Sequence, residues 1–372
     1  MTRRVEKSAN VAEVVKNFNF WGDFVDFRPF GNGHINDTYL IRTRFEGKIR
    51  KYILQRINGN VFKNPEQVMS NIMNVTAFLR EQVIKAGGDP ERENINIIKT
   101  KNDKKGYFID GYGDVWRAMV YVVDAISLES PEDRNDFYQS AVAFGNFQRQ
   151  LASYPAESLY ETIPNFHNTP VRYENFLKSL EKNASGRAAN AEKEIEFVKQ
   201  RKDFTSVLED AYEKGILPKR VTHNDTKLNN VMLDKDTREP VCVVDLDTIM
   251  PGYSVNDFGD SIRFGASTAA EDERDLDKVH FDIELFETYT RGFLNGCGGI
   301  LTENEIMLLP EGAKMMTLEC GMRFLTDYID GDTYFKTSSE DHNLVRCRTQ
   351  FKLVEEMEAQ WDEMKRIVEK YK

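Results

Sequence analysis

The most informative stretch of the sequence is VTHNDTKLNN, residues 221–230, which the apolar run VCVVD, residues 241–245, soon follows. The first stretch has the spacing H-x-D-x-x-x-x-N and leads into a short β run, and the second is a strand that ends in an acid. This spacing places Asn230 on the strand that leaves a polar loop, opposite the strand that ends at Asp245. A carboxylate in the loop and two oxygen ligands on neighbouring strands are therefore expected to converge.

This set of side chains is suited to phosphoryl transfer. Asp225 would orient an attacking hydroxyl and accept its proton, while Asn230 and Asp245 would hold a metal ion against the phosphates. Hard oxygen ligands favour Mg²⁺ over zinc. The octapeptide alone also occurs by chance, but the strand that follows it and the segment NDFGD, residues 256–260, strengthen the interpretation. A metal-dependent hydrolase that uses Asp225, Asp245 and Asp247 is an alternative.

Short alternating runs and turn residues predict antiparallel strands in the first third of the chain. A helix is expected to start at Asn64-Pro65 and to stop at Gly87-Gly88. The expected strands cover residues 23–30, 38–45, 52–57, 95–98, 106–110 and 116–123.

Long helices are expected after Asp124, with residues 220–265 as the one non-helical stretch. Gly296 is expected to end the fourth helix, and Thr302 to Glu305 to form a capping box for the fifth. These helices are placed at about 130–153, 171–183, 189–214, 281–295, 303–328 and 341–371.

The composition excludes several classes of protein. The chain has 372 residues, with 50 Lys and Arg against 61 Asp and Glu, and this net charge of −11 disfavours nucleic-acid and membrane partners. It shows neither an apolar run long enough to span a membrane nor a secretory signal, so a cytoplasmic location is expected. Four widely spaced cysteines argue against a disulfide framework. A monomer or a simple homodimer is expected.

The order of these motifs resembles the aminoglycoside phosphotransferase and choline kinase branch of the protein-kinase-like fold. More closely, the sequence resembles the N-acetylhexosamine 1-kinases in the strings FGNGHINDTY (30–39), YILQRIN (52–58), VFKNP (61–65), THNDTKLNN (222–230), DLDTIMP (245–251) and DFGDSIR (257–263).

The resemblance implies an α+β, two-lobed fold, with a small antiparallel-sheet lobe over residues 1–123 and a larger helical lobe over residues 124–372. It also implies ATP- and Mg²⁺-dependent phosphorylation of the anomeric hydroxyl of a small-molecule sugar, N-acetylglucosamine or N-acetylgalactosamine. A kinase of choline, an aminoglycoside or homoserine and a catalytically silent nucleotide-binding regulator are the alternatives.

The nucleotide side of the expected site starts with Gly31, Asn32 and Gly33, whose turn would let backbone N–H groups approach the phosphates, although it could equally be an ordinary hairpin. Asn36 and Thr38 would add side-chain donors. Val122 and Val123, on the strand that connects the lobes, would contact the adenine.

Gln55 stands where kinases usually carry a lysine on the third strand. An amide cannot supply the charge of that lysine, so Arg56, another base or the metal ion must compensate. As an alternative, Gln55 and Arg56 are simply a half-exposed strand pair.

His223 is expected to orient the loop, and the kinase-like resemblance implies that Asp257 braces it by accepting backbone hydrogen bonds. Sugar recognition requires several side chains that pair with hydroxyl groups near Asp225. Polar patches in the helical half supply the candidates, each of which could instead be a solvated charge or part of a salt bridge: His167, Arg172, Arg323, Asp327, Tyr334 and Arg346.

Overall fold

A computed structural model describes residues 11–31 and 35–372 of the chain. The chain forms two compact units. Unit 1 takes the described residues up to Ala125 together with Leu159–Ile163 and Val241–Ile249, and unit 2 takes Ile126–Ser158, Pro164–Pro240 and Met250–Lys372. Over the described residues, every helix is too short or too polar to cross a lipid bilayer.

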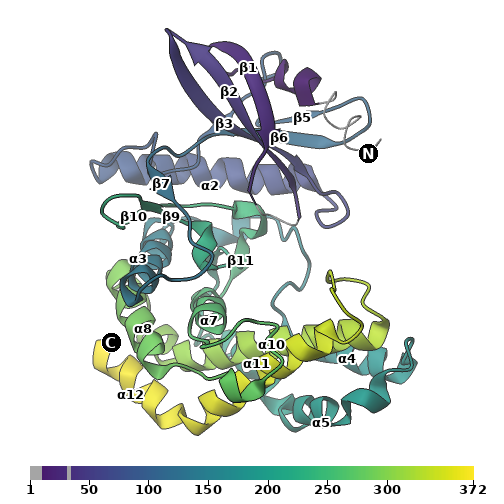
Figure 1. The fold of residues 1–372 in the computed structure, drawn as a ribbon. Coiled ribbons are helices and arrows are strands. Elements are labelled where there is room, and N and C mark those ends of the chain that lie inside the picture. Colours follow the sequence, from purple (N-terminus) through teal and green to yellow (C-terminus); the bar gives the residue numbers. More distant parts are fainter. Residues whose placement is uncertain (1–10, 32–34) are drawn as a thin grey trace. The chain divides into compact units, whose positions relative to one another are not determined.

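Unit 1 is built on an antiparallel sheet with the strand order β1-β2-β3-β6-β4, and β5 also pairs with β6 (Figure 1). The long helix α2 (Pro65–Lys85) accompanies the sheet and begins with proline, as the sequence predicts. The strands are β1 (Asp23–Pro29), β2 (Asp37–Phe45), β3 (Lys48–Ile57), β4 (Ile97–Ile98), β5 (Tyr107–Ile109) and β6 (Val115–Val120).

The strand predictions for unit 1 are confirmed in place and number, with shifted ends. Strand β3 begins at Lys48, directly after the tight turn at Gly47, and not at Tyr52. Strand β6 ends at Val120, so the prediction that it continues to Val123 is wrong. Val122 and Val123 follow the strand, and the Val123 side chain is 53% exposed because the chain turns there.

The two faces of this sheet differ in polarity. Leu54 of β3 lies in register with Ala118 of β6, and both are buried in an apolar cluster that includes Phe18. Because side chains alternate along a strand, the neighbours Gln55 and Arg117 lie on the opposite face. The sheet of unit 1 therefore has an apolar face and a face that carries polar side chains.

Unit 2 is mainly helical, with α7 and α11 both packed against α10 (Figure 1). The short strands β8 (Arg220–Thr222) and β11 (Met250–Gly252) pair antiparallel. Unit 2 also contains β9 (Val231–Asp234). The chain passes from one unit to the other within β7 (Ala125–Ile126) and within β10 (Pro240–Val243). The helices are α3 (Arg134–Gln150), α4 (Thr169–Lys182), α5 (Glu192–Gln200), α6 (Val207–Glu213), α7 (Ser254–Gly265), α8 (Ile283–Cys297), α9 (Glu303–Met307), α10 (Leu309–Asp330), α11 (His342–Ala359) and α12 (Trp361–Tyr371).

Three of the predicted long helices are interrupted. The stretch 189–214 holds α5 and α6 with a 3₁₀ segment between them, and 341–371 is broken at Gln360. The stretch 303–328 is broken at Leu308, directly before a helix that has Pro310 in its first turn. A proline fits that position because its missing N–H is not needed there.

Two further predictions for unit 2 are wrong. Residues 254–265 form the buried helix α7 within the stretch expected to be non-helical. Helix α8 continues past Gly296 and is capped by Gly298, which has a left-handed φ of 57°. Gly296 instead allows α8 to approach α3, since a Cβ atom there would lie 2.4 Å from the carbonyl oxygen of Val142.

A second glycine contact fixes the position of α7. A Cβ atom on Gly259 would lie 2.2 Å from the carbonyl oxygen of Gly312 in α10, and one on Gly312 would lie 2.2 Å from that of Val255. The two helix backbones therefore touch, and neither side can yield by a simple rotamer change.

We expect Gly259→Ala to destabilise the protein by about 1–3 kcal/mol or more, because the added methyl group must push two helix backbones apart. Urea unfolding followed by circular dichroism measures the change. Gly111→Ala is the matched control, since a Cβ atom there meets no other atom within 4 Å. Equal stabilities of the two variants would contradict the close packing of α7 on α10.

Candidate active site

The loop that carries Asp225 is held by a buried carboxylate of α7. Asp257, which is 1% exposed, accepts hydrogen bonds from the backbone N–H groups of His223 (2.9 Å) and Asn224 (2.8 Å). Asn224 has a left-handed φ of 64°, a conformation that turns these successive N–H groups toward one acceptor. The predicted brace thus has the required contacts, and Gln148 of α3 adds a third donor at 2.9 Å.

The surroundings of Asp257 act on its charge in opposite directions. Burial raises the pKa of its carboxyl group, while the charge of His223 and the hydrogen bonds from His223, Asn224 and Gln148 oppose the rise; the net pKa is raised. His223 itself is fully buried, with its ring edge-on to Phe144. Its place beneath the loop agrees with an orienting role.

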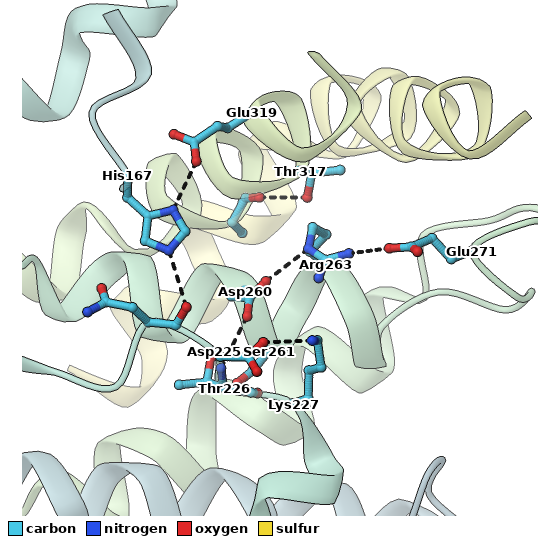
Figure 2. Close-up of polar contacts among 12 residues, drawn as sticks. His167, Asp225, Thr226, Lys227, Asp260, Ser261, Arg263, Glu271, Thr317 and Glu319 are labelled. Carbon is cyan, nitrogen blue, oxygen red and sulfur yellow. Dashed lines mark hydrogen bonds and ion pairs between the residues drawn. The ribbon is translucent and has the colours of Figure 1, made fainter. Parts of the chain in front are cut away.

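The loop is tied a second time through Thr226 (Figure 2). The backbone N–H of Thr226 donates to Asp260 (3.1 Å), and Arg263 also binds Asp260 (3.0 Å). Arg263 then reaches Glu271 (2.9 Å), which in turn accepts a hydrogen bond from Arg346 (2.9 Å). A chain of alternating charges therefore extends from the Asp225 loop to α11, which keeps each buried charge paired.

Asp225 itself is ion-paired with Lys227, whose Nζ lies 2.7 Å from Oδ1 (Figure 2). Desolvation alone lowers the pKa of Lys227, but the charges of Asp225 and Asp260 outweigh it and raise the net pKa, so the ammonium form is favoured. Sequence reasoning missed Lys227, although it lies only two residues after Asp225 within the motif. A cation in this position stabilises negative charge that develops beside Asp225.

Asn230 faces Asp225 with the donor end of its amide. Nδ2 donates to the backbone carbonyl of Asp225 at 2.8 Å and to its carboxylate at 3.2 Å. This leaves Oδ1, which accepts no hydrogen bond from the described residues, as an oxygen suited to a hard cation such as Mg²⁺. The donor set of this loop therefore fits the predicted metal.

The other predicted metal ligand, Asp245, belongs to unit 1 and follows β10. Its backbone has φ 60° and ψ 58°, a left-handed conformation that is uncommon for aspartate, and its side chain is exposed. Among the described residues, no group of three or more His, Cys, Asp and Glu side chains has the geometry of a metal site. The role of Asp245 as a metal ligand stays a prediction.

His167 is held between a carboxylate and the Asp225 loop (Figure 2). Its Nδ1 lies 2.9 Å from Glu319, and its Nε2 lies 3.3 Å from the backbone carbonyl of Asn224. Because both partners are acceptors, only the protonated ring can donate to both. These contacts occupy both nitrogens of His167, for which the sequence predicts contact with substrate.

Glu319, which sequence reasoning missed, is 1% exposed. Burial by itself raises the pKa of its carboxyl group, but the charges of His167 and Arg323 and the hydrogen bonds from His167 and Thr169 outweigh burial and lower the net pKa. Its signal in the sequence is weak, since Glu319 and His167 are 152 residues apart.

Four of the six predicted substrate residues line one cavity of about 130 Å³ in unit 2. Arg172 and Arg323 contribute cations, and Phe335 contributes an aromatic ring 5.5 Å from the Arg323 guanidinium. The other two of the four are Asp327 and Tyr334, the latter 65% exposed. The cavity combines hydrogen-bond donors with an aromatic surface.

Asp327 supports the shape of this cavity. Its carboxylate accepts hydrogen bonds from the backbone N–H groups of Thr333 (2.8 Å), Tyr334 (2.8 Å) and Phe335 (2.9 Å). Asn343 donates to it as well, at 2.8 Å. The residue thus holds the loop after α10 in place.

Arg346 does not lie among the residues that line the cavity. Its guanidinium is bound to Glu271 and stacks 3.9 Å above the ring of Phe324. It also lies 5.3 Å from the ring of Phe335, so it packs behind one wall of the cavity.

The predicted nucleotide residues belong to unit 1. Asn32 and Gly33 lie outside the described residues, and Gly31 has a left-handed φ of 75°. Thr38 accepts a hydrogen bond from Gln55 at 3.1 Å. Arg56 donates to Asp37 (2.9 Å) and to Asp114 (2.8 Å).

Asn36 lies in the same unit and donates to Asp247 at 2.6 Å. Asp247 also pairs with Arg117. Sequence reasoning missed Arg117, whose only signal is its register with Gln55 on the neighbouring strand.

We expect Glu319→Gln to lower the free energy of unfolding by about 1–3 kcal/mol at pH 7, because it removes the charge from a buried hydrogen-bond acceptor. The folded-state pKa of Glu319 lies below its ordinary value of 4.5, so its contribution is complete above that value and is lost as the pH falls through the folded-state pKa. Urea unfolding at pH 7 and at about pH 4 should show the gap between wild type and variant shrinking with acid. A difference in stability that stays constant with pH would contradict the lowered pKa of the Glu319 carboxyl group.

Comparison with known proteins agrees with this geometry. The model of the phosphotransferase enzyme family, APH, matches residues 26–291. Similar solved structures include spectinomycin phosphotransferase APH(9)-Ia in complex with ADP and spectinomycin, with 14% identity, a TM-score of 0.56 and coverage of 95% of this chain and 98% of that one.

Two other solved structures share the fold. Ethanolamine kinase from Plasmodium vivax is 14% identical, with a TM-score of 0.54 and coverage of 87% and 82% of the two chains. Choline kinase from Cryptosporidium parvum Iowa II is 12% identical, with a TM-score of 0.54 and coverage of 93% and 92%. The predicted kinase-like α+β fold is confirmed. Since the family match spans well over half of the sequence, the chain belongs to the phosphotransferase enzyme family.

Proposed function

We propose that the protein is an ATP- and Mg²⁺-dependent kinase that phosphorylates the anomeric hydroxyl of N-acetylglucosamine or N-acetylgalactosamine. One observation carries the proposal: Asp225, paired with Lys227 and Asn230, lies in the same unit as a cavity that combines arginine donors with aromatic rings. Family membership supports the transfer of a phosphoryl group. The six sequence strings that resemble N-acetylhexosamine 1-kinases support the choice of sugar.

In the proposed reaction, the anomeric oxygen of the sugar bonds to the γ-phosphorus of ATP, and Asp225 accepts the proton of that hydroxyl group. The bond from this phosphorus to the β,γ-bridging oxygen breaks, and the products are the sugar 1-phosphate and ADP. Lys227 is ion-paired with the carboxylate of Asp225 and would offer its cation to the transferred group. A metal ion bound by Asn230 and Asp245 would supply positive charge to the phosphate oxygens.

Hydroxyl groups of the sugar would pair with Arg172, Arg323 and Tyr334 in the cavity. An aromatic wall suits the apolar face of a pyranose ring, and Phe335 supplies one. His167 would then act on the reaction through the backbone of Asn224, because its two ring nitrogens are already engaged.

A kinase of another small alcohol is the second candidate. It is supported by the names of three solved structures that share the fold, an ethanolamine kinase, a choline kinase and a spectinomycin phosphotransferase. Against it stands the charge of the cavity lining, where Arg172 and Arg323 offset two aspartates, so a cationic acceptor such as choline gains no net attraction. The Asp327 carboxylate also accepts five hydrogen bonds within the protein, which leaves it poorly placed to balance such a cation.

ADP release from Mg·ATP in the presence of a panel of acceptors tests the proposal. We expect N-acetylglucosamine or N-acetylgalactosamine to give kcat/KM values at least about tenfold above those of choline, ethanolamine, homoserine and spectinomycin, since the cavity lining offers a cation no net attraction. Coupling of the product's ³¹P signal to the anomeric proton should locate the phosphate. Faster release with choline would support the second candidate, and ATP binding without release for any acceptor would indicate a regulator.

Asp225→Asn should lower kcat by about 10²–10⁴-fold, because an amide cannot accept the proton. Affinity for ATP, measured by calorimetry, should stay within about twofold of the wild type, since the proposed role of Asp225 concerns the acceptor hydroxyl. Asp236→Asn, at an exposed position of the turn after β9, is the matched control and should leave both quantities unchanged. An unchanged kcat in Asp225→Asn would remove this residue from the role of base.

A further inference from the structure

Three strands of unit 1 align a row of polar side chains on one face of the sheet. Thr38 of β2 is in register with Gln55 of β3, which is in register with Arg117 of β6. Gln55 donates to Thr38 at 3.1 Å, and Arg117 Nε donates to the side-chain oxygen of Gln55 at 2.9 Å. Gln55 thus stands where kinases usually carry a lysine, and its side-chain amide binds Arg117.

The Arg117 guanidinium is buried and fixed in orientation. The residue is 2% exposed and pairs through Nη1 with Asp247, which is 5% exposed. Asn36 donates to the other oxygen of Asp247 at 2.6 Å and accepts from the backbone N–H of Asn58 at 3.0 Å. Each member of this set is held by at least one other, so the guanidinium is pre-organised.

Arg117 also retains a donor. Its Nε and Nη1 are used by Gln55 and Asp247, while Nη2 makes no hydrogen bond with the described residues. Asp247 lies two residues after Asp245, the proposed metal ligand, on the same short segment of unit 1. A guanidinium presents its donors in a planar fork that matches phosphate oxygens.

Arg56, the other cation near this position, is directed elsewhere. It follows Gln55 on β3, so its side chain lies on the opposite face of the sheet. There it is bound to two carboxylates, those of Asp37 and Asp114. Its charge is already balanced on that face.

We propose that Arg117 supplies the cation for the α- and β-phosphates of the nucleotide in place of a third-strand lysine, and that Asp247 positions its guanidinium. The inference rests on the proposed function and extends it, since it assigns the binding of the negatively charged phosphates to a residue of β6. Gln55 is then a positioning residue that sets the plane of the fork through its side-chain oxygen.

Calorimetric titration with ADP and with adenosine, both in EDTA, tests the assignment without turnover and without metal. Adenosine lacks phosphates, so the ratio of its Kd to that of ADP reports phosphate binding alone. Arg117→Met/Asp247→Asn removes both charges and so avoids a lone buried carboxylate. We expect this variant to weaken ADP binding by about 10- to 100-fold and to leave adenosine binding within about twofold.

Arg117→Lys keeps the charge but loses the fork, and should weaken ADP binding by about 3- to 10-fold, again without change for adenosine. This variant retains the pair with Asp247 and serves if the double variant fails to fold. Arg42→Met/Asp26→Asn is the matched control, because it removes another arginine–aspartate pair from the same sheet, at an exposed position.

An unchanged ratio of the two Kd values in the Arg117 variants, or an equal loss of ADP and adenosine binding, would overturn the inference while the proposed function stands. Wild-type protein that binds neither ADP nor adenosine would refute the proposed function and the inference with it.

Discussion

The shape of the loop that carries Asp225 depends on one buried carboxylate, that of Asp257, which binds two successive backbone N–H groups directly before Asp225. Such a contact fixes the loop only if its helix cannot move. Backbone contact between Gly259 and Gly312 meets this condition by locking α7 against α10. The position of Asp225 thus follows from helix packing as much as from its own neighbours.

Charge is distributed differently around the loop and in the cavity. Around the loop, Asp260, Arg263, Glu271 and Arg346 alternate in sign, so each buried charge has a partner. In the cavity, Arg172 binds only a backbone carbonyl among the described residues, that of Phe166. Burial and then the charge of Arg323 lower the pKa of Arg172, which agrees with two cations facing one space. The cavity therefore keeps hydrogen-bond donors, which the proposed sugar would use.

Local sequence patterns predicted much of this architecture, but they did not predict the contacts between residues far apart in the chain. Proline at the start of α2 and the strands β1–β3 follow from backbone chemistry within a few residues, and both are confirmed. The contact between Arg117 and Gln55 depends on strand register across 62 residues, which no local pattern encodes. Helix α7 was missed for a related reason, since its polar side chains are satisfied by distant parts of the chain.

The residues that line the cavity come from α4, α10 and the loop after α10, all within unit 2, whereas the polar row of Thr38, Gln55 and Arg117 belongs to unit 1. Changes in one set therefore leave the packing of the other intact. If the proposed roles hold, the preference for an acceptor can change in evolution while the nucleotide-binding residues are inherited unchanged. A directed-evolution library confined to the cavity positions would likewise leave the polar row of unit 1 unchanged.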